Sequence, residues 1–460
     1  MAHLYLSAAH KSSGKTTLTL GICAALRERG MVVQPFKKGP DYIDPLWLSQ
    51  AAGRSCRNLD FYTMTPAEIG DLFAGSMSGA DVGLIEGNKG LYDGLALDGS
   101  NSNAALAAML EAPIVLVLDS QGMTRGIAPL ILGYQAFDPS LRILGVILNK
   151  VGGSRHESKL RQVIEHYTDV RVLGSVHRDE ALRIDERHLG LVPSNELTGS
   201  GLQISRMAEL LRQQVDLDGL LALAATAPAV SPSPAVAVHR KPPDVTIAYA
   251  KDAAFGFYYA DDLEALAAAG ARLVPFSPIK DRELPACDGL FLGGGFPETH
   301  MTALEANASM RAEVAGFVQR GGPVYAECGG LMSLCNHLTW NGNTRKLCGV
   351  IPASVAMHEK PQGRGYVKLR KTREHPWPGP GSDAQVIQAH EFHYSALDAV
   401  PDGLRFGYTV ERGHGLDGRH DGIVYRNLLA SYTHLRNTTA HAWAEHFVGF
   451  VRRQTVGNRD

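Results

Sequence analysis

The sequence lacks a dominant charge and lacks long apolar runs. Its 45 basic and 47 acidic residues give a formal net charge of −2, which offers no electrostatic footprint for nucleic acid or for an acidic membrane surface. No apolar run reaches the roughly 18 residues of a membrane-spanning helix. The amino terminus enters a strand pattern at once, without the features of a signal peptide. We therefore expect a cytoplasmic protein without nucleic-acid or membrane partners.

Cysteine is also scarce. The six cysteines show no C-x-x-C spacing and no clustering of the kind that binds a metal. We therefore expect reduced cysteines, five of them structural. Cys328 differs from the rest, because a short apolar run, Val324 to Glu327, leads directly into it and the glycines after it allow a tight turn into a helix.

Short apolar runs alternate with helical stretches, which predicts an α/β fold in both halves of the chain. In the first half these runs are residues 3–8, 32–36, 82–85, 114–118 and 143–148. Such a pattern is typical of a parallel sheet covered on both faces. Alanine and proline then dominate without periodicity, which marks a linker. We therefore expect a first domain over residues 1–220, a linker over 221–243 and a second α/β domain over 244–460.

A phosphate-binding loop follows the first apolar run. The segment Ser12-Ser-Gly-Lys-Thr-Thr17 lies between a predicted strand and a predicted helix, although Ala9 stands where the usual pattern has its first glycine. Gly14 lets the backbone approach phosphate, Lys15 can reach the β and γ oxygens, and the Thr16 hydroxyl can hold Mg²⁺. The loop therefore predicts ATP and Mg²⁺ as ligands, with Thr17 completing the motif.

Carboxylates follow two further strands, at the edge where an open parallel sheet binds its ligands. Asp41 and Asp44 come after one apolar run, and Glu86 and Asp93 come after another. Since Mg²⁺ takes only one or two carboxylates besides phosphate and water, Asp44 and Glu86 are the candidate ligands beside Thr16. The alternative for each single residue is a solvated turn.

Basic and amide side chains accompany these carboxylates. Lys37 or Lys38 could neutralise charge during phosphoryl transfer. Asn149-Lys150, after the last apolar run, could contact the nucleotide base or serve only in a turn.

The segment around Cys328 predicts a thiol on a strained strand-to-helix elbow, beside backbone N–H groups that could bind an oxyanion. The donors would be Gly329 and the turn Gly293-Gly-Gly-Phe-Pro-Glu298, which includes Gly294. A base must come from a histidine brought near by folding. The candidates are His390, His393 and His434. A thiol that releases ammonia, joined to a nucleotide site, predicts ATP-driven amide formation.

Along nearly its whole length the chain resembles the cobyrinic acid a,c-diamide synthase family. In the first half the matching segments are Ser13-Gly-Lys-Thr-Thr17, Pro35-Phe-Lys-Lys-Gly-Pro-Asp-Tyr-Ile-Asp-Pro45, Gly90-Leu-Tyr-Asp-Gly94 and Glu186-Arg-His-Leu-Gly-Leu191. In the second half they are Asp252-Ala-Ala-Phe255, Phe276-Ser-Pro278, Gly293-Gly-Gly-Phe-Pro-Glu298, Glu327-Cys-Gly-Gly330 and His390-Glu-Phe-His-Tyr-Ser395. The resemblance implies a dethiobiotin-synthetase-like P-loop domain followed by a class I glutamine amidotransferase domain.

The resemblance also implies the reaction. Glutamine is hydrolysed at Cys328 through a thioester, and the ammonia passes internally to the first domain. There ATP and Mg²⁺ convert a side-chain carboxylate of a tetrapyrrole into an acyl phosphate, which ammonia attacks. His434 matches the catalytic histidine of the family, while Asp41, Tyr42 and Asp93 lie in segments that handle nucleotide, substrate or intermediate. The expected partners are thus a tetrapyrrole, ATP and glutamine, with a homodimer left open.

Two departures keep alternatives open. Class I amidotransferases usually carry glutamate two residues after the catalytic histidine, where this chain has Arg436, so a Cys328–His434 dyad is expected and Glu391 is one candidate to orient the histidine. The family is also apolar where this chain has Asn88-Lys89, which favours siroheme as an alternative substrate to cobyrinate.

Three further points stay open at this stage. A P-loop switch ATPase that binds partner proteins would explain residues 1–200 alone. A protein without glutaminase activity would use free ammonia instead of glutamine. The basic side chains that could meet the substrate carboxylates are Arg364, Lys368 and Arg370, although a solvated strand face explains them equally well.

Overall fold

The computed structural model describes residues 1–187, 190–229, 241–377, 386–400 and 403–457. The chain divides into two compact units, Met1–Val236 and Ala237–Asp460. Residues 188–189 of the matching segment Glu186–Leu191, and residues 230–240 of the predicted linker, lie outside the described residues. Among the described residues, no helix combines the length and the apolar character needed to cross a membrane.

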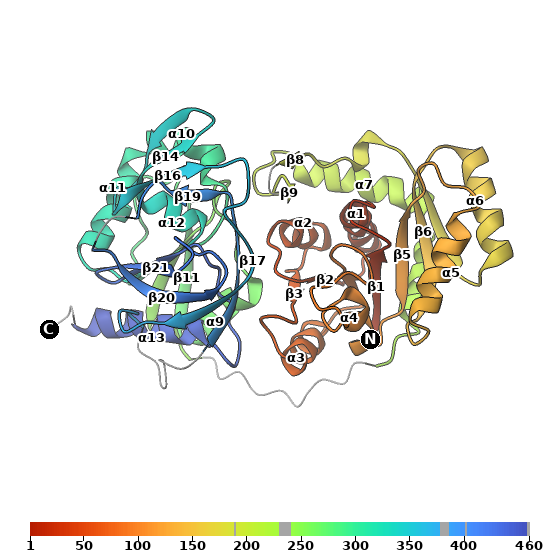
Figure 1. The fold of residues 1–460 in the computed structure, drawn as a ribbon, viewed down its shortest axis with the longest axis horizontal. Coiled ribbons are helices and arrows are strands. Elements are labelled where there is room, and N and C mark those ends of the chain that lie inside the picture. Colours follow the sequence, from red (N-terminus) through yellow and green to blue (C-terminus); the bar gives the residue numbers. More distant parts are fainter. Residues whose placement is uncertain (188–189, 230–240, 378–385, 401–402, 458–460) are drawn as a thin grey trace. The chain divides into compact units, whose positions relative to one another are not determined.

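The first unit is built on a seven-stranded parallel sheet (Figure 1). In sheet order its strands are β3 (Arg57–Leu59), β2 (Val33–Lys38), β4 (Val82–Glu86), β1 (Ala2–Ala8), β5 (Ile114–Asp119), β6 (Ile143–Val151) and β7 (Arg171–His177). The central strands are almost fully buried, as expected for a sheet with helices on both faces. A short pair, β8 (Glu186–Arg187) and β9 (Gly190–Leu191), lies outside this sheet.

Helices cover the first sheet. They are α1 (Lys15–Glu28), α2 (Ile43–Ala52), α3 (Pro66–Ser76), α4 (Asn103–Met109), α5 (Ile127–Phe137), α6 (Ser154–Tyr167), α7 (Ser200–Gln214) and α8 (Leu217–Ala224). One core joins strand side chains such as Tyr5 and Ile85 to apolar side chains of α3, α4, α5 and α6. Helices α1, α2, α7 and α8 contact strands of the same sheet. The parallel α/β fold expected from the sequence is therefore confirmed for this unit.

The start of the predicted linker is wrong by several residues. Residues 221–224 belong to α8, whose apolar side chains recur at helical spacing, with Leu217, Leu220 and Ala224 buried. The alanine-rich composition at this point favours helix as strongly as it suggests a linker. The composition therefore marked the region of the boundary but not the end of the last helix.

The second unit has a nine-stranded sheet. In order its strands are β11 (Ala271–Phe276), β10 (Val245–Ala250), β12 (Gly289–Leu292), β13 (Val324–Glu327), β22 (Leu428–Ser431), β21 (His420–Tyr425), β20 (Arg405–Arg412), β17 (Gly363–Lys371) and β18 (Val386–His393). The pairs from β11 to β22 are parallel, and those from β22 to β18 are antiparallel. A second sheet holds β15 (Asn343–Lys346), β14 (Cys335–Trp340), β16 (Ile351–Met357) and β19 (Ser395–Leu397).

Two apolar cores flank the larger sheet of the second unit. One core gathers side chains of α10 (Met301–Ala306), α11 (Ala308–Gln319) and α12 (Gly329–Leu334) together with the smaller sheet. The other gathers side chains of α9 (Ala260–Ala268) and α13 (Trp443–Gly457), including Trp443 and Phe447. Strands β13 and β22 lie side by side at the centre of this sheet, so whatever follows their carboxyl ends is brought together.

Candidate active site

The phosphate loop connects β1 to α1 in the first unit. Gly14 adopts a φ of +87°, a left-handed conformation that favours glycine, directly before the first turn of the helix. Asn149, at the end of β6, donates its amide N–H to the carbonyl of Ser13 at 2.8 Å. Asn149 therefore supports the loop itself, and this contact gives its side chain a role other than the base contact considered from the sequence.

Lys15 and Thr16 begin α1, and Thr17 follows them in its first turn. Lys15 is 7% exposed, and its ammonium donates to the carbonyl of Lys89 at 2.5 Å. Burial lowers the pKa of Lys15 to about 8, although Glu86 opposes this effect. A phosphate group in the loop would supply the opposite charge that a buried ammonium needs.

Lys37 joins the two candidate metal-binding carboxylates. Its ammonium donates to Asp44 Oδ2 at 2.5 Å and to Glu86 Oε1 at 2.9 Å, and the Thr16 hydroxyl donates to Glu86 Oε1 at 2.6 Å and to Asp44 Oδ2 at 3.2 Å. Burial would lower the pKa of Lys37, but Asp44 and Glu86 outweigh it and hold that pKa well above its usual value. The structure thus brings together four residues that lie up to 70 positions apart in the chain: Thr16, Lys37, Asp44 and Glu86.

This cluster fits a divalent cation. Oε2 of Glu86 is buried and has no hydrogen-bond partner among the residues that the structure describes. Burial raises the pKa of the Glu86 carboxyl despite the nearby Lys37, so an added cation would stabilise its ionised form. Two carboxylates and a threonine hydroxyl are a donor set suited to Mg²⁺, which completes its coordination with phosphate and water.

Lys38 does not belong to this cluster. It follows Lys37 in β2, and successive side chains of a strand point to opposite faces. Burial lowers the pKa of Lys38 to about 8, and its charged neighbours are Asp60 and Lys89 rather than the metal-site carboxylates. Of the two lysines proposed from the sequence, the geometry favours Lys37.

The remaining predicted residues of the first unit hold loops around this site. Asp41 Oδ1 accepts from the N–H groups of Ile43 and Asp44 at the start of α2, directly before which the buried Tyr42 lies. Asp93 Oδ2 accepts from the N–H of Gly90 at 2.9 Å. These contacts order the segments that carry Asp44 and the Lys89 carbonyl.

The segment Asn88-Lys89 is held through its backbone. The Asn103 side chain accepts from the Asn88 N–H at 3.0 Å and donates to the Asn88 carbonyl at 2.5 Å. Lys89 has a φ of +44°, which is uncommon for a residue with a side chain and directs its carbonyl to Lys15. The segment Asn88-Lys89, at which the family is usually apolar, therefore lies directly beside Lys15 of the phosphate loop.

In the second unit Cys328 lies between β13 and α12, on the predicted elbow. Its φ of +47° and ψ of −103° are strained for a non-glycine residue, and its N–H donates to the Ser431 carbonyl at 2.7 Å. The side chain is 7% exposed. This strain falls on the residue whose thiol would react, as expected for a nucleophile elbow.

His434 is brought to Cys328 by the pairing of β13 with β22. Glu327 lies opposite Ser431 in this parallel register, and His434 follows three residues later. Burial would lower the pKa of His434, but hydrogen bonds to Cys328 and to the Glu327 carboxylate outweigh it and raise that pKa to about 10. A protonated imidazole stabilises the thiolate form of the nucleophile.

The other two candidate histidines have different environments. His390 pairs with His434 through the backbone, with His434 N–H donating to the His390 carbonyl at 2.7 Å. Burial lowers the pKa of His390 to about 3, so its imidazole stays neutral. His393 stacks on Tyr432 with ring centroids 3.9 Å apart, and its Nδ1 lies 2.8 Å from the Ser395 carbonyl. The geometry therefore favours His434 as the base.

The glycine turn after β12 closes the other side of the site. A β-carbon added at Gly294 would lie 2.6 Å from Cε1 of His434, and one added at Gly329 would lie 3.0 Å from the N atom of Gly295. Both positions therefore exclude larger side chains. The turn and the first N–H groups of α12 lie against each other, as the predicted oxyanion site requires.

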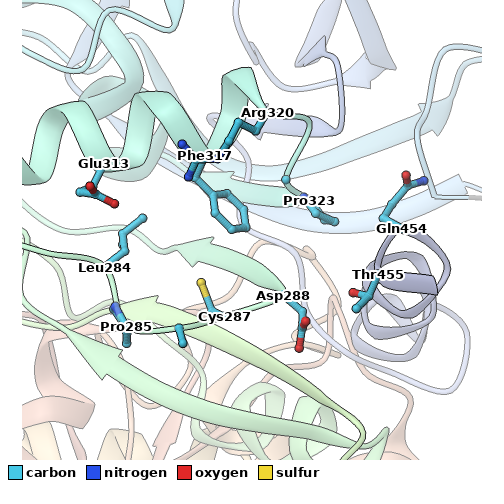
Figure 2. A pocket seen from close by; sticks show the side chains of 12 residues that line it. Leu284, Pro285, Cys287, Asp288, Glu313, Phe317, Arg320, Pro323, Gln454 and Thr455 are labelled. Carbon is cyan, nitrogen blue, oxygen red and sulfur yellow. The ribbon is translucent and has the colours of Figure 1, made fainter. Parts of the chain in front are cut away.

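A separate cavity opens at the amino-terminal ends of β12 and β13, opposite the ends that carry the glycine turn and Cys328 (Figure 2). It is lined by Asp288, which precedes β12, by Pro323, which precedes β13, and by Cys287. Because Cys328 follows the carboxyl end of β13, this cavity is not the glutamine site. Burial raises the pKa of Cys287 to about 11, so its thiol is poorly reactive at neutral pH. All six cysteines are free.

The basic residues proposed to meet substrate carboxylates lie on β17. Arg370 pairs with Glu411, and the Arg364 guanidinium lies 5.4 Å from the centroid of the Phe392 ring. Arg436, which stands in place of the usual glutamate, pairs with Asp261 at 2.8 Å and lies over the Tyr259 ring. A contact of the β17 side chains with substrate remains a prediction.

Known proteins resemble the chain over nearly its whole length. Residues 8–192 match the family model described as a CobQ/CobB/MinD/ParA nucleotide binding domain. Residues 246–440 match the model described as a CobB/CobQ-like glutamine amidotransferase domain. These two matches cover the segments that contain the phosphate loop, Cys328 and His434.

Full-length relatives have been described in several organisms. The cobyrinate a,c-diamide synthase of Magnetococcus marinus is 47% identical over 98% of this chain and 97% of its own length. That of Methanosarcina acetivorans is 39% identical over 94% of this chain and 91% of its own. That of Listeria monocytogenes serotype 4b is 37% identical over 98% of this chain and 100% of its own.

Proposed function

The chain belongs to the cobyrinate a,c-diamide synthase family, and we propose that it is a ligase that uses ATP and glutamine to amidate the a and c side-chain carboxylates of cobyrinate. One observation carries this proposal: a thiol–imidazole pair on a strained elbow and a phosphate loop occur in the same chain. The first site alone would release ammonia, and the second alone would activate a carboxylate. Amide formation from glutamine needs both.

The thiol site performs the glutaminase step. The Cys328 thiolate attacks the side-chain amide carbon of glutamine, and the resulting oxyanion accepts hydrogen bonds from the Gly329 N–H and the turn at Gly294. Protonated His434 gives its proton to the leaving nitrogen, so that ammonia departs and a thioester remains. Water then attacks the thioester with His434 as the base, which releases glutamate and restores the thiol.

The phosphate loop performs the ligase step. A carboxylate is a poor electrophile, and transfer of the γ-phosphoryl group of ATP to its oxygen creates a leaving group. Ammonia attacks the acyl carbon, the amide forms, and inorganic phosphate departs. Lys15 and Lys37 stabilise the negative charge that spreads over the phosphoryl oxygens. Thr16, Asp44 and Glu86 would hold Mg²⁺, which when bound neutralises phosphate charge.

Replacing Thr16 by valine tests the metal site. Valine keeps the shape but removes the hydroxyl that contacts Asp44 and Glu86. The Mg²⁺ concentration for half-maximal activity should rise by about 10-fold or more, since even the loss of a group that only orients a metal ligand typically weakens metal binding by that factor. Thr19→Val is the matched control, because its buried hydroxyl bonds to the Lys15 carbonyl on the same helix and touches neither carboxylate. Equal Mg²⁺ dependence of the two variants would contradict the assignment.

The proposed substrate is tested by incubating the protein with ATP, Mg²⁺ and glutamine and measuring product masses. Cobyrinic acid and siroheme are offered in parallel. We expect cobyrinic acid to be converted through a monoamide to a diamide, with siroheme unchanged. Amidation of siroheme alone would overturn the proposed substrate but keep the chemistry, and Asn88-Lys89 would then be the segment to exchange. ATP hydrolysis without amidation of either would favour the switch-ATPase alternative.

Two finer expectations belong to the same proposal. A homodimer would be recognised by sedimentation of the purified protein at the mass of two chains. A cytoplasmic location would be recognised by fractionation of the native cells. Neither affects the reaction proposed for the two sites.

A further inference from the structure

We propose that Glu327, the residue directly before the nucleophile, is the positioning residue for the catalytic histidine of the glutaminase site. This inference rests on the proposed roles of Cys328 and His434. Class I amidotransferases usually have the glutamate that orients the histidine two residues after it, where this chain has Arg436. With Glu327 in that role, the site is a triad rather than a dyad.

The contacts of the Glu327 carboxylate support this role. Its Oε2 accepts from Nδ1 of His434 at 3.2 Å. Its Oε1 accepts from the N–H of Leu435 at 2.9 Å and from the Tyr325 hydroxyl at 2.6 Å. The Glu327 side chain is only 4% exposed. A buried carboxylate held by three donors has one orientation, and through it His434 has one orientation.

The elbow explains how two consecutive residues reach one imidazole. Along a regular strand, Glu327 and Cys328 would point to opposite faces of the sheet. The positive φ of Cys328 breaks this alternation at the end of β13, so both side chains are hydrogen-bonded to His434. The backbone strain thus has a second consequence besides exposing the thiol, since it lets the carboxylate and the nucleophile share the histidine.

The carboxylate determines which nitrogen faces the thiol. When Nδ1–H donates to Glu327, the other ring nitrogen, Nε2, is left to exchange a proton with Cys328. The same carboxylate stabilises the imidazolium that forms when the thiol is ionised. Replacing it by an amide would place N–H donors beside Nδ1, which favours the wrong tautomer.

The other acidic candidate is occupied elsewhere. Glu391 accepts from the N–H groups of His414 and Gly415 at 2.7 and 2.8 Å, and its oxygen lies 3.7 Å from Nε2 of His393. None of these contacts reaches His434. The suggestion from the sequence that Glu391 orients the catalytic histidine is therefore replaced by Glu327.

The test compares Glu327→Gln with Glu391→Gln in the full-length protein. Glutaminase activity is followed as ammonia release, and amidation with added ammonium measures the other site. We expect Glu327→Gln to lower the glutaminase kcat by about 10²- to 10⁴-fold with little change in KM for glutamine. Glu391→Gln should stay close to the unchanged protein, and both variants should keep ammonium-dependent amidation.

A purely structural role is separated by the pH profile. Loss of the carboxylate lowers the pKa of His434, so the alkaline limit of the residual glutaminase activity should move to lower pH in Glu327→Gln. Glu327→Asp keeps the charge and should recover part of the activity. Glu327→Asp also serves as the test variant if Glu327→Gln does not fold. In that case the alkaline limit of glutaminase activity should again move to lower pH, by a smaller amount.

The possible failures are distinguishable. Glutaminase activity of Glu327→Gln equal to that of the unchanged protein, or a folded Glu327→Asp with unchanged rate and pH profile, would overturn the positioning role alone. Absence of glutaminase activity in the unchanged protein would overturn the proposed function of Cys328 and His434 and this assignment with it.

Discussion

Cys328→Ser is expected to abolish amidation from glutamine and to preserve amidation from ammonium. The serine hydroxyl is far less acidic than the thiol, and His434 at this site is arranged to stabilise a thiolate. The glutamine-dependent rate should fall by about 10³-fold or more, as for the loss of a nucleophile in other covalent enzymes. The rate with ammonium at alkaline pH should stay close to that of the unchanged protein.

Cys287→Ser is the matched control for this experiment. Its thiol is partly buried at the opposite end of the same strands, and burial raises its pKa. We expect no loss of either activity. Equal glutamine-dependent rates for Cys328→Ser and the unchanged protein would show that the thiol is not the nucleophile. Loss of both nitrogen sources would show instead that the substitution damages more than the glutaminase site.

Lys15→Met is expected to give the opposite pattern. The methionine side chain fills similar space but has no charge to place on the β and γ phosphates. Amidation should fall by about 10²-fold or more with either nitrogen source, since charge stabilisation is the main contribution of such a site. Ammonia release from glutamine should continue, because Cys328 and His434 belong to the other unit.

Lys159→Met controls for the loss of a positive charge. Lys159 lies exposed on α6, and its replacement should change neither activity. Normal amidation by Lys15→Met would contradict the assignment of the phosphate loop. If Lys15→Met also lost glutaminase activity, the two sites would be coupled more strongly than the separate chemistry requires.

Much of the fold follows from patterns that are local in the sequence. Buried parallel strands give continuous apolar runs, and the phosphate loop and the elbow each combine a strand, glycines and a helix within a few residues. For that reason the α/β class, the phosphate loop and the elbow at Cys328 could be predicted. The end of α8 could not, because an alanine-rich segment next to prolines is typical of both helix and linker.

The carboxylate partner of the histidine was missed for a physical reason. A charged residue at the end of a buried strand was visible at Glu327, but its role depends on the pairing of β13 with β22, whose residues are about 100 positions apart. The usual position of the glutamate, two residues after the histidine, holds Arg436, and the sequence offered Glu391 as a candidate instead. Likewise, the sequence offered Lys37 and Lys38 equally as the lysine of the phosphate site. Only the alternation of side chains between the two faces of the sheet along β2 separates them.

The central claim is that nitrogen taken from glutamine at Cys328 is used at the phosphate loop of the same chain. The most direct measurement uses glutamine labelled with heavy nitrogen at its side-chain amide, together with cobyrinic acid, ATP and Mg²⁺. We predict a diamide whose new amide nitrogens both carry the label. A label found only in free ammonia, with no amidated product, would contradict the account.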